Sequence, residues 1–149
     1  MQDNRAQAIK VLVAQWIGRA RSDLILARMT EDERILPEIL AFHAQQAAEK
    51  ALKALLVHDQ VEFPRTHVIA LLLNLCERAG HQVPEKLSDA LVLTRYAVAT
   101  RYPSAEDPVT RDEAREAALT AANVLNWVEE WLERSSPPSE PAPQSDGGV

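Results

Sequence analysis

The stretch from Ala41 to Leu56 constrains the fold of this chain more than any other part of its sequence. Ala, Leu, Gln, Glu and Lys dominate it, and all of these are strong helix formers. It contains no Gly, Pro or β-branched residue that would favour a break or a strand. The stretch therefore predicts one long helix, which begins near Leu36 or Pro37 and runs to about Asp59.

At about 100° per residue, this helix has two faces of different character. One face should pack against a core, and it carries Phe42, Gln45, Ala48, Leu52, Leu55 and Leu56. The other face is polar, with small alanines at 44, 47, 51 and 54, and it carries His43, Gln46, Lys50 and Lys53. Because alanines let a second helix come close, this polar face suggests an interface.

The whole sequence predicts an all-α fold, an up-and-down bundle of four to five helices. The expected helices cover about residues 4–29, 37–59, 67–79, 84–102 and 110–134. Two segments, which start at Thr30 and Thr110, have the layout of capping boxes, and Thr66 is placed to cap the third helix. The bundle should form one domain over residues 1–134. A Pro/Ser/Gly-rich tail over residues 135–149 has nothing to bury and should be disordered.

The expected first helix has an apolar stripe and a charged outer face. Its glycine, Gly18, either weakens the helix or lets a neighbour come close. We expect Asp23 to lie in water beside the arginines of the outer face. The stripe contains Ile9, Leu12, Val13, Trp16, Ile17, Ala20, Leu24 and Ala27, and the arginines are Arg19, Arg21 and Arg28.

Composition agrees with a helical domain and excludes several classes of site. Of the 149 residues 46% are hydrophobic and only 5% aromatic, and the net charge of -6 provides no overall basic character for a nucleic acid. The single cysteine, Cys76, lies in an apolar run, so we expect a buried, inert thiol and no multi-cysteine metal site. No phosphate loop, dinucleotide fingerprint or His-Glu-x-x-His motif is present, and we expect no cofactor and no metal.

The sequence also indicates where the protein is located. No apolar run approaches the ~20 residues needed to span a bilayer, and the amino terminus lacks the layout of a signal peptide. We therefore expect a cytoplasmic protein that does not contact a membrane.

The string Phe-His-Ala-Gln-Gln-Ala-Ala-Glu-Lys-Ala-Leu-Lys-Ala-Leu-Leu, from Phe42 to Leu56, resembles the long second helix of the HEPN domain family. Three further segments fit in the expected order: Trp16 with Asp23-Leu24, Pro64-Arg65-Thr66-His67, and Arg101-Tyr102-Pro103. The likeness covers about residues 10 to 133. It implies a small all-α domain of a family linked to nucleotide and RNA chemistry.

The resemblance also implies a function and partners. Similar proteins are often homodimers that work beside a separate nucleotidyltransferase in prokaryotic two-component, toxin-antitoxin-like modules. The expected cleft would bind a nucleotide or RNA, with Arg101 to hold phosphate and Tyr102 to stack on a base. The candidate binding residues are His43, Gln46, Lys50, Lys53, His67, Arg101 and Tyr102.

Each candidate also has a purely structural explanation. Lys53 forms an ordinary i,i+4 pair with Glu49, which is worth a few tenths of a kcal/mol. His67 fits an ordinary polar turn, and Tyr102 fits a gap in the core. A second hypothesis is therefore a protein-interaction or dimerisation module that holds a partner protein and no ligand.

Many members of the family are metal-independent ribonucleases with an Arg followed, after four to six intervening residues, by a His. This sequence has no such pair, so we assign no catalytic residue and do not expect an enzyme. An unconventional ribonuclease that depends on His67 or Arg101 is the third hypothesis.

Overall fold

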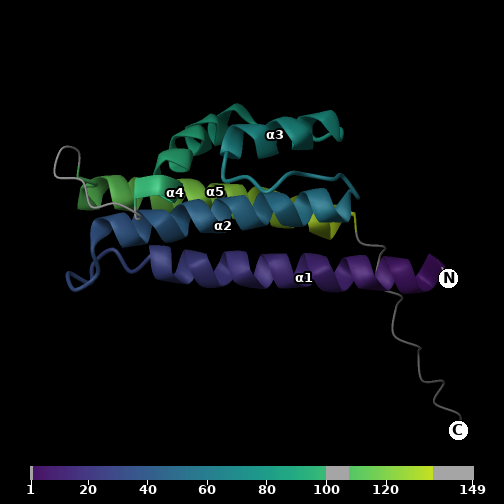
Figure 1. Ribbon diagram of the computed structural model, residues 1–149, viewed down its shortest axis with the longest axis horizontal. Helices are drawn as coiled ribbons and strands as arrows, with labels where there is room; N and C mark the ends of the chain where they lie inside the picture. The colour runs from purple at the N-terminus through teal and green to yellow at the C-terminus, as the bar shows by residue number, and fades with distance from the viewer. Residues whose placement is uncertain (1, 100–107, 136–149) are drawn as a thin grey trace, which may run out of the picture.

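The structure is a computed structural model, and it describes residues 2–99 and 108–135. Within these ranges every regular element is a helix, which confirms the predicted all-α class (Figure 1). In chain order the elements are α1 (Gln2–Ala27), α2 (Pro37–His58), α3 (Ile69–Arg78), the 3₁₀ helix η1 (Glu85–Arg95), α4 (Tyr96–Ala99) and α5 (Arg111–Arg134).

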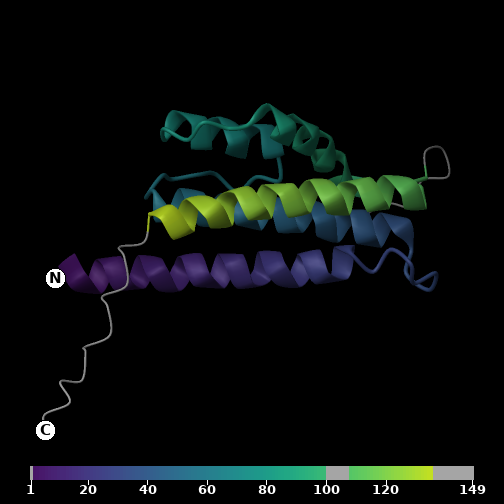
Figure 2. The same cartoon turned by 180° about the vertical axis from the view of Figure 1, so that it is seen from behind.

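The long helix α2 lies at the centre of the bundle. Figure 1 shows α1 antiparallel to α2 on one side, with α5 beside α2 and running in the same direction. The shorter elements α3 and η1 lie on the side of α2 away from α1, and they return the chain to the start of α5 (Figures 1 and 2). Helices from the same chain therefore contact α2 on several sides.

The prediction that the polar face of α2 is open is wrong, because much of that face is buried. Ala44, Ala47, Ala51 and Ala54 were expected between polar residues on that face, and all four are fully buried. The helices that pack most extensively against α2 are α1 and α5 of the same chain. The alanine spacing thus explains close packing within one molecule, and it does not by itself indicate an interface between molecules.

Two residues of α1 face the opposite way from the prediction. Asp23, expected in water on the outer face, is buried, whereas Leu12, expected in the core stripe, is 47% exposed. Val13, next to Leu12, packs against the core, so Leu12 lies at the exposed edge of the packed side of α1. The sequence pattern alone does not show how wide a side of α1 the neighbouring helices cover.

The third and fourth helices differ from the prediction at their starts. Thr66 does not cap α3: its Oγ1 accepts a hydrogen bond from the Val68 amide at 3.0 Å. The helix begins at Ile69, whose amide donates to Thr94 Oγ1 at 3.0 Å. The expected α-helix after Pro84 is instead the 3₁₀ helix η1, followed by the single turn α4. This 3₁₀ helix of 11 residues is far longer than the usual three or four.

The predicted capping box at the start of α5 is confirmed. Thr110 Oγ1 accepts from the Glu113 amide at 3.1 Å, and Glu113 Oε1 accepts from the Thr110 amide at 3.2 Å. The hydrogen bond from the Thr110 amide holds the pKa of the Glu113 carboxyl below its ordinary value. The box predicted at Thr30 does not form, because the segment is a turn whose carbonyls at Thr30 and Ile35 accept from Arg111 at 2.8 and 2.9 Å.

Cys76 is fully buried, as predicted, and burial raises the pKa of its thiol to about 12. Among the residues that the structure describes, no helix combines the length and apolar character needed to cross a bilayer. Ser135 caps the end of α5. The rest of the predicted tail, and the Arg101-Tyr102-Pro103 segment, lie outside the described residues.

The central position of α2 leads to a stability prediction. Replacing Ala51 with Leu adds three heavy atoms where α2 has no free space, so we expect Ala51→Leu to destabilise the fold by about 1–3 kcal/mol. The matched control is Ala70→Leu on the exposed side of α3, which should change stability little. Urea unfolding followed by circular dichroism measures both. Equal stability of the two variants would contradict the burial of α2.

Candidate functional site

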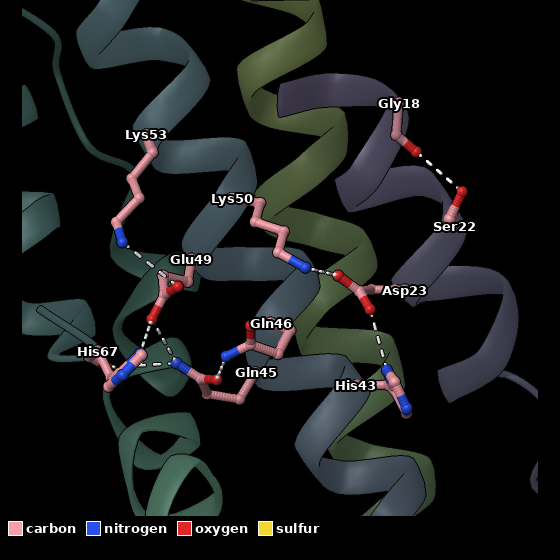
Figure 3. Close-up of polar contacts among 10 residues, drawn as sticks. All are labelled: Gly18, Ser22, Asp23, His43, Gln45, Gln46, Glu49, Lys50, Lys53 and His67. Atoms are coloured by element: carbon pink, nitrogen blue, oxygen red, sulfur yellow. Dashed lines mark hydrogen bonds and ion pairs between the residues drawn. The ribbon is translucent and has the colours of Figure 1, made fainter. Parts of the chain in front are cut away.

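A buried aspartate of α1 anchors two of the candidate residues of α2. His43 Nδ1 donates to Asp23 Oδ1 at 2.9 Å, and Lys50 Nζ donates to Asp23 Oδ2 at 2.5 Å (Figure 3). The side chain of Asp23 is 11% exposed and that of Lys50 is 22% exposed. One carboxylate therefore holds a histidine and a lysine at the junction of α1 and α2.

A second carboxylate, from α2 itself, repeats this arrangement on the other flank of the helix. Glu49 Oε1 accepts from His67 Nδ1 at 2.6 Å and from Gln45 Nε2 at 3.2 Å. Glu49 Oε2 accepts from Lys53 Nζ at 3.4 Å (Figure 3). Gln45 also donates to the backbone carbonyl of His67 at 3.3 Å, which fixes the chain just before α3. His67 is thus held at both its ring and its backbone.

The two histidines present the same nitrogen to a ligand. Because an ionised carboxylate only accepts hydrogen bonds, the hydrogen lies on Nδ1 of both His43 and His67. The opposite nitrogen, Nε2, then carries the lone pair of the neutral ring. The side chain of His67 is 54% exposed and that of His43 is 26% exposed, so His67 is the more accessible of the two.

Both candidate lysines have their charges balanced within the chain. Lys50 is paired with Asp23, and Lys53 with Glu49. The ammonium of Lys53 also lies 5.7 Å from the ring centres of Trp16 and Phe63. The expected solvent-exposed i,i+4 pair of Glu49 and Lys53 is therefore a buried one, with side chains 4% and 10% exposed. Neither lysine offers an unpaired positive charge to phosphate.

Five of the seven candidates lie on or beside α2, and the remaining two fall outside the described residues. Gln46 is half-buried and donates to Gln45 Oε1 at 2.6 Å, so it belongs to the same network as His67. Arg101 and Tyr102 lie outside the described residues, and no geometry joins them to the rest.

Asp23 and Glu49, which hold these candidates, were not proposed as site residues from the sequence. One signal in the sequence pointed to such a network. Gln45 lies on the apolar face of α2, and a buried amide needs hydrogen-bond partners.

The other two histidines share a carboxylate at the far end of α2. Asp59 accepts from His58 Nδ1 at 3.0 Å and is paired with His81 Nε2. His81 lies edge-on to Trp127 and Trp131 and is almost wholly buried. Each of the four histidines thus pairs with a carboxylate, and within the described residues no three metal-ligand side chains cluster as a metal site requires.

The family model described as HEPN domain matches residues 13–131 of this chain. The chain belongs to the HEPN domain family. The resemblance inferred from the α2 sequence is therefore confirmed. Asp23 and Glu49, the two carboxylates described above, lie within this HEPN domain.

One relative and two solved structures are similar to this HEPN protein over most of its length. A relative from Methanocaldococcus jannaschii, named "Putative toxin MJ1304", is 28% identical over 131 residues, which covers 78% of this chain and 86% of the relative. The crystal structure of ST0689, described as an archaeal HEPN homologue, has a TM-score of 0.63 at 30% identity and covers 80% of this chain and 97% of its own. TT1696 from Thermus thermophilus gives a TM-score of 0.63 at 32% identity, with 79% of this chain and 96% of its own covered.

The Asp23–Lys50 pair of this HEPN protein is open to a double-mutant test. Asp23→Asn leaves Lys50 half-buried without its counterion, and we expect a loss of about 1–3 kcal/mol. Adding Lys50→Met should restore part of that loss, because the charge left unpaired is removed. Urea unfolding of the four proteins gives the coupling energy.

The matched control cycle is Glu31→Gln with Arg115→Met, a pair at 3.1 Å whose side chains are 82% and 42% exposed. This exposed pair should couple weakly. Additive losses in the Asp23 cycle, within the error of the control, would contradict the pairing.

Proposed function

We propose that this HEPN protein is the toxin-like half of a cytoplasmic two-component module, and that it works as a homodimer beside a separate nucleotidyltransferase. The observation that carries the proposal is the family match over residues 13–131, together with a relative that is named as a toxin. In this proposal the chain binds a nucleotide or RNA and is not itself the nucleotidyltransferase.

The geometry supports a ligand that is recognised by hydrogen bonds more than by charge. Lys50 and Lys53 are already paired with carboxylates, so they add little to phosphate binding. His67 offers a fixed and exposed ring, whose Nε2 accepts a hydrogen bond from a ribose hydroxyl or a base amine. Arg101 and Tyr102 are proposed to supply the phosphate and stacking contacts.

The direct test is a calorimetric titration of the protein with ATP, GTP and short single-stranded RNA. We expect at least one of them to bind, and His67→Gln to weaken binding by about tenfold, since it removes a contact worth about 1.4 kcal/mol. Arg115→Gln, a polar change on the surface of α5, is the control and should bind like the wild type. Absence of binding by all three ligands at millimolar concentration would contradict the ligand part of the proposal.

Growth of a host cell tests the toxin part separately. Expression of the chain alone should slow growth, and co-expression of its nucleotidyltransferase partner should restore it. Unimpaired growth at high expression would remove the toxin role, and it would leave the binding result unaffected.

The second candidate function is a protein-interaction module without a ligand. It is favoured by the same pairing of Lys50 and Lys53, because a face whose charges are internally balanced is a weak anion site but a suitable protein surface. Purification of the native complex separates the two candidates. A stoichiometric protein partner with no bound nucleotide favours the interaction module. Cleavage of the RNA used in the titration, lost in His67→Gln, would favour the ribonuclease.

A further inference from the structure

A groove of about 450 Å³ lies between η1 and the first half of α5 (Figure 2). Three residues of the buried core, Leu93, Tyr96 and Ala117, contribute to its lining. Val92 of η1 and Leu119 of α5 also line it, and they are 55% and 68% exposed. Leu119 is the most exposed large apolar side chain among the described residues. This η1–α5 groove therefore has apolar surface in contact with water on both of its sides.

The charged residues that line the η1–α5 groove are all acidic within the described part of the chain. Glu113 is paired with Arg95, whose guanidinium donates to its carboxylate at 2.5 Å. Asp89 of η1 and Glu116 of α5 are exposed, and neither has a hydrogen-bond or ion-pair partner among the described residues. The groove thus keeps two uncompensated negative charges, one from each of its two helices.

The negative charge continues on the other side of η1. A second groove, of about 330 Å³, lies between α3 and η1, and its charged lining residues are Glu77 and Glu85. Lys86, the lysine of η1, lines neither groove. Because the carboxylates repel anions on both sides of η1, phosphate groups are not expected here. Charge and exposed apolar surface together indicate an occupant that is cationic and partly apolar.

The length of the η1–α5 groove fits a helix. Its lining residues on α5 run from Glu113 to Asn123, a distance of about 15 Å at 1.5 Å per residue, or about three helical turns. The described part of the chain contains no strand to which an extended peptide could be added. A peptide bound here must therefore satisfy its own backbone, as a helix does.

We propose that the η1–α5 groove binds a basic amphipathic helix of a partner protein. The apolar side of that helix packs between Val92 and Leu119, and its Lys or Arg side chains pair with Asp89 and Glu116. Opposite charge draws the helix to the groove and sets its direction, whereas the apolar contact supplies most of the affinity. A second copy of this chain does not fit this chemistry, because it brings a net charge of -6 to an acidic surface.

The proposal names the chemistry of the partner in the two-component module, and it rests on the proposed function only for the existence of a protein partner. Its argument uses the residues of η1 and α5 and no toxin or nucleotide role. Peptide binding tests the groove, whereas growth and nucleotide titration test the function, so the two fail separately.

A model peptide of about 14 residues tests the groove. It consists of leucines and lysines, placed so that the leucines share one side of a helix, and fluorescence anisotropy follows its binding to the full chain. We expect this ordered peptide to bind, and the same peptide with Glu in place of Lys not to bind. A shuffled peptide, whose leucines share no side, should bind at least about tenfold more weakly. Absence of binding by the ordered peptide, or equal binding of the ordered and shuffled peptides, would overturn the proposal.

Charge reversal locates the contact. Asp89→Lys with Glu116→Lys should weaken binding of the ordered peptide by at least about tenfold, since two attractions become repulsions. The matched control is Glu62→Lys with Glu130→Lys, which makes the same change in net charge at exposed positions outside the groove and should change binding by less than about twofold. Circular dichroism checks that both variants fold. Equal losses in the two variants would show that net charge alone attracts the peptide, and the proposal would fail.

Removal of an apolar side chain of the groove gives an independent test. Leu119→Ser should weaken binding of the ordered peptide by about tenfold, whereas Ile25→Ser, which changes a similarly exposed residue on α1, should bind like the wild type. Unchanged binding by Leu119→Ser would contradict the apolar contact. Light scattering of the chain alone tests the other occupant: a change in mass caused by Leu119→Ser would mean that the groove holds a second copy, and it would refute a partner helix.

Discussion

The structure depends on the hydrogen bonds and ion pairs of the polar side chains of α2, because this helix is buried on several sides. Four alanines let α1 and α5 come close to α2, and this closeness leaves little water for the polar residues beside them. Asp23 and Glu49 meet this constraint by supplying acceptors to two lysines, two histidines and a glutamine. Such groups are costly when unpaired and roughly neutral when paired, so the network fixes the geometry of the bundle more than it adds stability.

The same pairing defines what this surface offers to a ligand. In a chain with a net charge of -6, Lys50 and Lys53 were among the candidates for binding a nucleotide or RNA. The carboxylates change that expectation, because the ammonium group of each lysine lies within 3.4 Å of a carboxylate oxygen. The most exposed of these side chains is His67, whose ring is oriented by its hydrogen bond to Glu49. A histidine oriented by a carboxylate recognises a hydroxyl or an amine with direction, whereas a free lysine recognises an anion with little direction.

The sequence predicted the parts of the fold that depend on local signals. Periodicity and helix formers located α2, and the capping box located the start of α5, because these features act within a few residues. Three parts were missed, two of them because they depend on distant contacts. The amide of Ile69 uses the hydroxyl of Thr94 for its cap, the fourth helix is mostly 3₁₀, and Asp23 turns inward to reach residues of α2. A pattern shows which residues share a face, but it does not show how many faces will be covered.

The two sides of α1 show why this limit matters. Asp23 faces the core and pairs with Lys50, whereas Ser22 beside it faces outward with its hydroxyl bonded to the Gly18 carbonyl. One side of the helix is thus committed to α2 through an ion pair, and the opposite side keeps Arg19 and Arg28 exposed to solvent. The small residues Ala20 and Ala27 lie on the buried side, as expected for a helix that packs closely on its neighbour. Asp23 departs from this order, and it is buried because His43 and Lys50 of α2 stand opposite it and pair with its carboxylate. The sequence of α1 alone does not contain these partners, so its periodicity could not predict which way Asp23 points.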